Sequence, residues 1–187
     1  RIAALESQES RTSGAAVAAL AAAALVEASQ GSRPFPAELA ALRTAAPEAP
    51  ELAALSRLAD AGAPSRAALA ASFPDYAARA ASAGRTPAED SGVGDRLIFA
   101  ISKFVSLRRV GDVAGDSPDA RLARAERAFE EGDIEGGLKA LDGLSPASRE
   151  ALAPWRARAE QRAEIDRQAA TLRARALRDL APAGTGA

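Results

Sequence analysis

The residues with the clearest chemical pattern lie between Asp95 and Val110, where large apolar side chains are interspersed with basic ones. At about 100° per residue, an α-helix would place the large aliphatic side chains and one ring of this segment within a single arc. Lys103 and Ser106 fall outside that arc. The segment is therefore predicted to be an amphipathic helix whose apolar face consists of Leu97, Ile98, Ile101, Phe104 and Val105.

Positive charge dominates the same segment, since several basic side chains accompany a single acid, Asp95, in a chain whose net charge is −1. An apolar face beside basic groups suits an anionic membrane, where the apolar side chains enter the acyl region and Lys and Arg meet the headgroups. Phe99 projects near the polar side, where a core-facing helix has no use for a large ring. We predict membrane binding by Arg96, Leu97, Ile98, Phe99, Ile101, Lys103, Phe104, Val105, Arg108 and Arg109.

A competing interpretation is that this helix forms one wall of a protein core, as amphipathic helices in soluble proteins commonly do. The protein would then be a soluble, tetratricopeptide-like adaptor that binds a peptide or helix in a groove without lipid. The flanking residues, 85–94 and 111–115, are rich in Gly, Pro, Ser and acidic residues. This composition favours a helix that is connected to the rest of the protein by two flexible linkers. Salt-sensitive lipid binding distinguishes the two interpretations.

Several classes of chemistry are excluded by composition. The chain has no Cys, His or Met, so thiolate nucleophiles, His-based triads and Cys/His zinc sites are excluded. Carboxylates lie among arginines at helical spacing, as Glu160 does with Arg156, which is typical of a solvated face. We therefore expect no catalytic residue, cofactor or metal. The near-neutral charge also argues against binding nucleic acid.

The elements that must position this segment are expected to be helices, because no strand-like alternation occurs along the chain. Apolar residues make up 48% of the sequence but aromatic residues only 4%. Alanine dominates, so helices can approach closely while each buries little area. The prediction is an all-α, Ala-rich helical bundle that gains further burial by forming a homo-oligomer.

Cap and breaker residues predict the helix boundaries in the first half of the chain. Thr12 and Ser13 are expected to begin a helix that runs to Ser29. Its apolar run is too short to span a bilayer, which needs about 20 residues, so we expect a tightly packed core helix. Pro and Gly residues then separate shorter predicted helices at residues 35–45, 50–61, 65–72 and 74–83.

In the second half, Ser117 is predicted to cap a helix whose first residue is Pro118 and which ends at Gly132. Asp133 then caps a second helix, and the two together have the pattern of one tetratricopeptide-like hairpin. A short helix is expected from Ser145, followed by a long C-terminal helix from Pro154. Three large residues are candidates for core anchors or partner contacts: Phe129, Leu138 and Trp155.

The order of these segments resembles the C-terminal region of the mitofilin family in its alphaproteobacterial form. The matching residues are Val105-Ser-Leu-Arg-Arg-Val-Gly111, Gly115-Asp-Ser-Pro-Asp119, Ala125-Glu-Arg-Ala-Phe-Glu-Glu-Gly-Asp-Ile134 and Ala153-Pro-Trp155. They extend over about half of the chain. Their order and spacing carry the resemblance.

The resemblance implies a membrane-shaping scaffold of the inner membrane that faces the bacterial periplasm and contacts the outer-membrane β-barrel assembly machinery. An N-terminal transmembrane anchor and a coiled coil would precede this piece of the chain, and the sequence begins at Arg1 without an initiating Met. The expected segments are the end of a coiled coil (1–12), an Ala-rich helical segment (13–84), a linker (85–94), the amphipathic lipid-binding helix (95–110) and a mitofilin-like helical domain (111–187).

Overall fold

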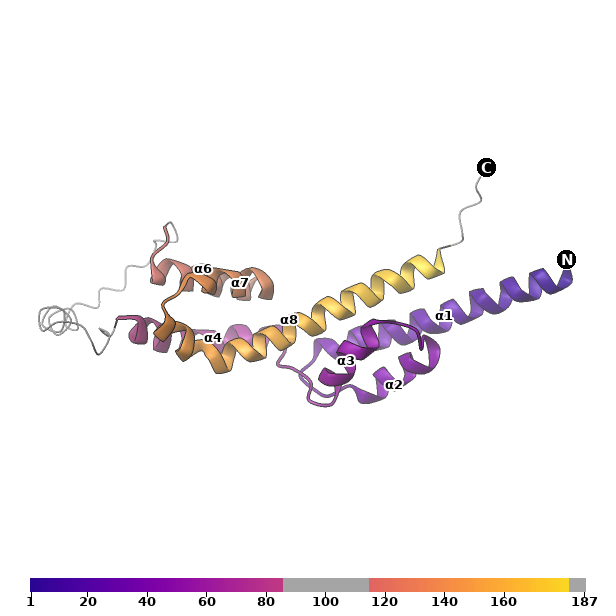
Figure 1. Ribbon diagram of the computed structural model, residues 1–187, viewed down its shortest axis with the longest axis horizontal. Coiled ribbons are helices and arrows are strands. Elements are labelled where there is room, and N and C mark those ends of the chain that lie inside the picture. The colour runs from indigo at the N-terminus through magenta and orange to yellow at the C-terminus, as the bar shows by residue number, and fades with distance from the viewer. Residues whose placement is uncertain (86–114, 182–187) are drawn as a thin grey trace, which may run out of the picture. The chain divides into compact units, whose positions relative to one another are not determined.

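The computed structural model describes residues 1–85 and 115–181 (Figure 1). Within these ranges all regular structure is helical and no strand occurs, which confirms the all-α prediction. The described residues form two compact units: unit 1 joins the two ends of the sequence, and unit 2 lies within the range between them, Arg66–Glu160. The predicted amphipathic helix, residues 95–110, lies outside the described residues. The predicted division into functional segments follows different boundaries from the two units and stays a prediction.

Unit 1 contains α1 (Ile2–Gln30), α2 (Pro36–Ala45), α3 (Glu51–Ala59) and the part of α8 (Pro146–Leu180) that follows Glu160. Its helices bury a stripe of leucines at helical spacing, and Phe35 fills the turn before α2. Ala59, the last residue of α3, and Ala63, which follows the helix, are buried in the same core. The larger core side chains are Leu25, Phe35, Leu39, Leu42, Leu52, Leu55, Ile165 and Leu172.

Helix α1 differs from the prediction. The helix does not begin at Thr12 and Ser13 but runs continuously from Ile2, and the Thr12 hydroxyl donates to the Gln8 carbonyl oxygen one turn earlier (2.9 Å). Because the helix is this long, its residues Leu5–Gln30 meet the length and composition needed to cross a membrane. Core helices and signal sequences meet the same criterion, so this finding alone assigns no span.

The helix expected from Thr12 and Ser13 to Ser29 is a packed core helix only near its C-terminal end. Among the side chains of α1 that the structure describes, only Ala22, Leu25 and Ser29 are buried, all near its C-terminal end. The reason is that α2, α3 and α8 provide a core for that end alone, and the first four turns contact no large apolar surface among the described residues.

Unit 2 contains α4 (Arg66–Arg85), α6 (Pro118–Glu130), α7 (Ile134–Ala140), the 3-10 turn η1 (Leu141–Gly143) and the first part of α8. The predicted caps are confirmed: the Ser117 hydroxyl accepts from Ala120 N (3.2 Å), and the Asp133 carboxylate accepts from Gly136 N (2.8 Å). Gly132 has a positive φ of 80°, which allows the turn between α6 and α7. These two helices pack as the predicted hairpin.

Three aromatic rings from three helices form the centre of unit 2. Phe73 of α4, Phe129 of α6 and Trp155 of α8 contact one another with ring centroids 4.8–4.9 Å apart. Their interplanar angles of 58–65° are the tilted or edge-on arrangements that aromatic quadrupoles favour. The Trp155 indole N–H donates to the Ser72 hydroxyl (3.1 Å) and lies 3.3 Å from the Leu69 carbonyl oxygen. The ring cluster therefore ties α4, α6 and α8 together.

Helix α7 crosses close to this cluster because it carries Gly137. A Cβ atom at that position would overlap the ring of Phe129, so only glycine permits the contact. Gly137 therefore marks a close crossing of α6 and α7. The crossing brings Leu138 and Ile134 of α7 into the buried core.

Two predicted helix breaks do not exist. Pro74 lies inside α4 and Pro154 lies inside α8, so the separate helices expected at residues 65–72 and 74–83 are one, as are the short and long C-terminal helices. Both prolines are exposed, and each adjoins a residue of the buried ring cluster, Phe73 or Trp155. Proline normally breaks a helix because it lacks a backbone N–H and its pyrrolidine ring clashes with the preceding turn. Packing of the Phe73 and Trp155 rings stabilises the two helices by more than this costs.

Candidate functional site

The ten residues predicted to bind membrane, from Arg96 to Arg109, lie outside the described residues, and their role stays a prediction. The structure does describe the two positions at which the surrounding segment joins unit 2. Helix α4 ends at Arg85, and Gly115 leads into α6. We call the region around these two positions the attachment end. It consists of Arg85, residues 115–119, Ser145 and Ser148.

The two attachment points lie close together. Arg85 Nη2, at the end of α4, lies 3.5 Å from Asp119 Oδ1 in the first turn of α6. The Arg85 Nε–H also donates to the Ala81 carbonyl oxygen (3.1 Å), which holds the guanidinium over the last turn of its own helix. Both side chains of the ion pair are mostly exposed, so the pair adds little stability. Its importance is geometric, because it places the end of α4 beside the first turn of α6.

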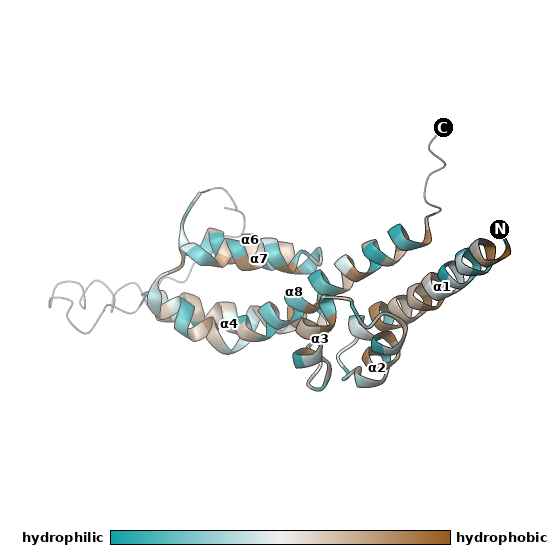
Figure 2. Cartoon of the chain, turned by 45° about the vertical axis from the view of Figure 1, so that its right-hand side comes forward, coloured by the Kyte–Doolittle hydropathy of each residue, from teal (hydrophilic) through white to brown (hydrophobic). Residues whose placement is uncertain are grey.

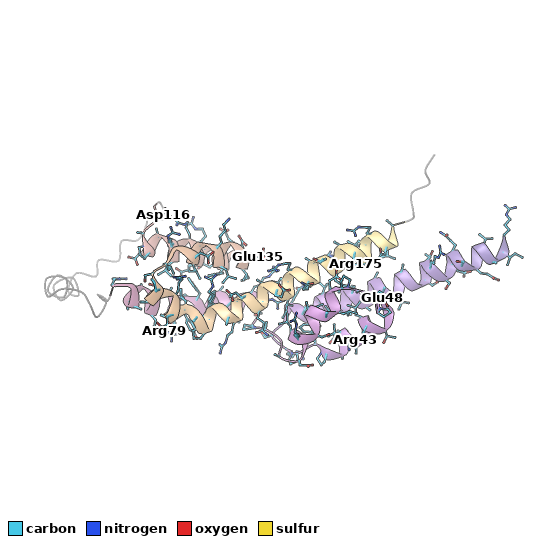
Figure 3. The ribbon with its side chains drawn as sticks, viewed as in Figure 1. Arg43, Glu48, Arg79, Asp116, Glu135 and Arg175 are labelled. Carbon is cyan, nitrogen blue, oxygen red and sulfur yellow. The ribbon has the colours of Figure 1, made fainter. Side chains whose placement is uncertain are left out.

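The stretch before α6 is held by two arginines of that helix. Asp116 Oδ1 lies 3.1 Å from Arg121 Nη2 and 3.6 Å from Arg124 Nη2, and the Arg124 guanidinium also donates to the Gly115 carbonyl oxygen (2.5 Å). Figure 3 labels Asp116 beside the start of α6. The acids at the attachment end are therefore paired with arginines of unit 2.

The start of α8 supports the attachment end from a third side. Ser148 is buried, and its hydroxyl donates to the Ala80 carbonyl oxygen of α4 (2.9 Å). Ser145 caps α8, since its hydroxyl accepts from Ser148 N (3.2 Å). A Cβ atom on Gly84 would overlap the Ser148 hydroxyl oxygen, so the last turn of α4 lies directly against the first turn of α8. Three helix ends thus meet at one place and can position an attached segment.

The predicted anchor residues are core residues in the structure. Phe129 and Trp155 are each about 1% exposed, and Leu138 is also buried. Trp155 and Phe129 belong to the ring cluster, which leaves neither side chain at the surface of the chain for a partner to contact. The last helix buries a seam of apolar residues, Ile165, Ala169 and Leu172, whereas Leu180 is exposed.

A buried arginine was not predicted. Arg162 is 1% exposed, its Nη1 donates to the Ser29 carbonyl oxygen of α1 (2.6 Å), and its Nη2 lies 2.5 Å from Asp166 Oδ1. The sequence carried a signal, because Arg162 precedes Ile165 by three residues and so falls on the same seam. The guanidinium satisfies one of the last carbonyl groups of α1, where a cation is also favoured by the helix dipole.

A second charged contact in unit 1 also escaped prediction. Glu51, in the first turn of α3, is buried, and its Oε1 lies 3.1 Å from Arg175 Nη2 on α8. Glu51 Oε2 has no hydrogen-bond partner among the described residues. The contact joins residues 124 positions apart, and no short-range pattern marks it.

In unit 2 an exposed cluster joins α8 to η1. Arg156 donates to Glu160 Oε1 and to Asp142 Oδ1, both at 2.8 Å. The hydrogen bond to Glu160, which has the largest effect, and the one to Asp142 raise the pKa of Arg156 above its usual value. The side chain therefore stays charged. Within residues 1–85 and 115–181, no group of three or more acidic side chains is arranged to hold a metal ion.

Comparison with known proteins identifies a class of relatives. The chain is 31% identical over 135 residues to the MICOS complex subunit Mic60 of Sclerotinia sclerotiorum, a match that covers 70% of this chain and 20% of that protein. The Mic60 of Phaeosphaeria nodorum is 33% identical over 124 residues, covering 64% of the chain and 20% of that protein. The Mic60 of Pyrenophora tritici-repentis is 33% identical over 117 residues, covering 60% of the chain and 18% of that protein.

The chain thus corresponds to about a fifth of the length of these relatives. No family profile matches it, and no solved structure does. The matches support the mitofilin family for this chain, as the resemblance implied. The three relatives are fungal, so they do not support the alphaproteobacterial form in particular.

Proposed function

We propose that this chain belongs to a non-enzymatic scaffold that organises the inner membrane, and that residues 95–110 bind anionic phospholipid. The observation that carries the proposal is the combination of an apolar face with basic side chains in this segment, in a chain whose relatives are MICOS complex subunits. The apolar side chains of residues 95–110 enter one leaflet below the headgroups, while the Arg and Lys side chains stay at the membrane surface. Insertion into one leaflet favours curvature.

The attachment end supports this mechanism geometrically. Because Arg85 and Asp119 form an ion pair, a membrane-bound segment is tethered at both ends to the same end of unit 2. Binding then brings that end of unit 2 to the bilayer. Contacts among α4, α6 and α8, through Ser148 and the ring cluster, make unit 2 a rigid support.

The wider setting follows from the family. We infer that the complete protein is anchored in the inner membrane by an N-terminal transmembrane helix, with these helices on the periplasmic side in a bacterium. Its copies self-associate, and it contacts the outer-membrane β-barrel assembly machinery. The support for this setting is the similarity to Mic60 proteins over about a fifth of their length.

Lipid binding is tested by placing a charge in the apolar face. Phe104→Glu is expected to abolish co-flotation with anionic liposomes, because a carboxylate cannot enter the acyl region and is repelled by the headgroups. Leu177→Glu is the matched control. Leu177 is an exposed apolar residue on α8 outside the segment, so this variant should float like the wild type.

Circular dichroism separates the competing interpretations. If residues 95–110 bind lipid, Phe104→Glu keeps the wild-type helical content and melting temperature. If they form a core wall, the same substitution buries a charge and unfolds the protein. Unchanged flotation of a folded Phe104→Glu variant contradicts the proposal. A wild-type protein that does not bind lipid would instead be the soluble adaptor.

A further inference from the structure

The chain that leads into α6 is held by more than a helix cap. Residues 115–117 each accept a hydrogen bond from α6. The cap accounts only for Ser117, whose hydroxyl accepts from a backbone N–H of the first turn. The two residues before it are held by the side chains of Arg121 and Arg124. Figure 2 shows hydrophilic residues along α6, the helix that supplies both arginines.

The two arginines hold the backbone as well as the acid. Arg121 Nε–H donates to the Asp116 carbonyl oxygen (3.2 Å), and its Nη2 lies 3.1 Å from Asp116 Oδ1. Arg124 Nη1 donates to the Gly115 carbonyl oxygen (2.5 Å), and its Nη2 lies 3.6 Å from the same carboxylate oxygen. Neutralising a carboxylate would need no contact with backbone oxygens. Because a guanidinium offers several N–H donors in fixed directions, these contacts fix the path of the chain.

The fold also provides a place for the Arg121 guanidinium. A Cβ atom on Gly143 of η1 would overlap this group, so the guanidinium lies directly against Gly143. Only 24% of the Arg121 side chain is exposed. Gly115 has a φ of 116°, which residues with a Cβ atom rarely adopt. We call Gly115, Asp116, Arg121, Arg124 and Gly143 the α6 clamp.

We propose that the α6 clamp is a positioning device for membrane binding. It fixes the point at which the chain from residues 95–110 joins unit 2, and so sets how unit 2 is oriented on the bilayer. The inference rests on the proposed function and adds to it a role for residues that act without contacting lipid. Gly115, which composition alone assigned to a flexible linker, is part of this device.

Chain length indicates what the clamp changes. Val110 and Gly115 are five residues apart, so their Cα atoms are separated by at most about 18 Å. Opening the clamp would free residues 115–117, which adds about 10 Å of reach and the torsional freedom of three residues. A closed clamp therefore keeps the attachment end near the bilayer to which residues 95–110 bind.

Energy transfer to the membrane tests the orientation. The chain has no Cys, so one donor dye can be placed on Glu150→Cys, near the attachment end, or on Glu131→Cys, at the far end of α6. Both positions are exposed. The vesicles contain neutral and anionic phospholipid and a small fraction of phospholipid with an acceptor dye on its headgroup. Transfer from Glu150→Cys should exceed transfer from Glu131→Cys by at least about twofold, because α6 separates its two ends by about 20 Å.

Gly143→Ala opens the clamp without changing any charge, because the new Cβ atom displaces the Arg121 guanidinium. This variant should float with liposomes as the wild type does, while the difference in transfer between the two dye positions falls at least about twofold. Arg121→Lys/Arg124→Lys keeps the net charge, loses the guanidinium fork and should have the same effect. The matched control Arg127→Lys/Arg158→Lys makes the same exchange at exposed positions of α6 and α8 and should leave transfer unchanged.

NMR of the arginine side chains tests the clamp without a membrane. The Nε–H of Arg121 should exchange with solvent at least about tenfold more slowly than that of the exposed Arg158, because it is hydrogen-bonded and partly shielded. Gly143→Ala should remove this difference. Equal exchange rates for the two side chains in the wild-type chain overturn the inference.

The two proposals can fail separately. A wild-type chain that does not float overturns the proposed function, and with it the membrane role of the clamp. A chain that floats but whose Gly143→Ala and Arg121→Lys/Arg124→Lys variants keep the wild-type transfer overturns the inference alone.

Discussion

Phe129→Ala is expected to lower the free energy of unfolding of unit 2 by about 3–5 kcal/mol, as truncation of fully buried aromatic residues does. Phe129 contacts the rings of Phe73 and Trp155, and its ring lies against Gly137 of α7. The substitution therefore removes apolar burial and two ring contacts, and it leaves a cavity where α4, α6, α7 and α8 meet.

Urea denaturation followed by Trp155 fluorescence measures this effect, because Trp155 is the only Trp of the chain and lies in unit 2. The matched control is Leu20→Ala on α1, an exposed large apolar residue of unit 1. We expect it to leave the fluorescence transition within about 0.5 kcal/mol of the wild type. A cost below about 1 kcal/mol for Phe129→Ala would show that the ring cluster does not hold unit 2 together.

Asp166→Ala is expected to lower the free energy of unfolding of unit 1 by about 3–5 kcal/mol, because it leaves the guanidinium of Arg162 buried without its carboxylate. Arg162 is almost completely buried, and Asp166 is its ion-pair partner one turn along α8. Removing both charges with Arg162→Met/Asp166→Ala should recover most of the loss. Urea denaturation followed by circular dichroism measures each variant.

The same helix supplies a matched control. Arg156 and Glu160 form a pair at the same four-residue spacing, but 28% and 55% of their side-chain surfaces remain exposed. Glu160→Ala should cost no more than about 1 kcal/mol. Equal losses for Asp166→Ala and Glu160→Ala would contradict the role assigned to burial, and so would a double variant as unstable as Asp166→Ala.

Local signals predicted much of the fold. Ser117, Gly132 and Asp133 occupy the predicted places at the ends of α6 and α7, because a cap or a turn depends on the residues directly around it. The leucines of α2 and α3 that form the core of unit 1 also recur at helical spacing, which is a local pattern.

Errors arose where distant parts of the chain meet. Pro74 and Pro154 were each expected to begin a new helix, but Phe73 and Trp155 pack against each other across the sequence and keep both helices continuous. Tertiary packing of this kind outweighs local preference. The missed ion pairs have the same origin, as with Arg85 and Asp119, which are brought together only when α4 and α6 pack.

The candidate site also has one part that the local sequence predicts and another that depends on tertiary packing. The apolar and basic pattern of residues 95–110 is local and could be predicted, and its assignment to lipid remains a prediction. The attachment end could not be predicted from the sequence. Its residues come from α4, the start of α6 and the start of α8, and only the folded chain brings them together.

The most direct test of the central claim is co-flotation of this chain with liposomes in which the anionic phospholipid fraction is raised stepwise, at low salt and at about 1 M salt, where the screening length falls to about 3 Å. If residues 95–110 bind anionic membrane, the floated fraction rises with anionic lipid and falls sharply at high salt. A floated fraction that stays near zero, or that is independent of anionic lipid, would contradict a membrane-binding role for residues 95–110.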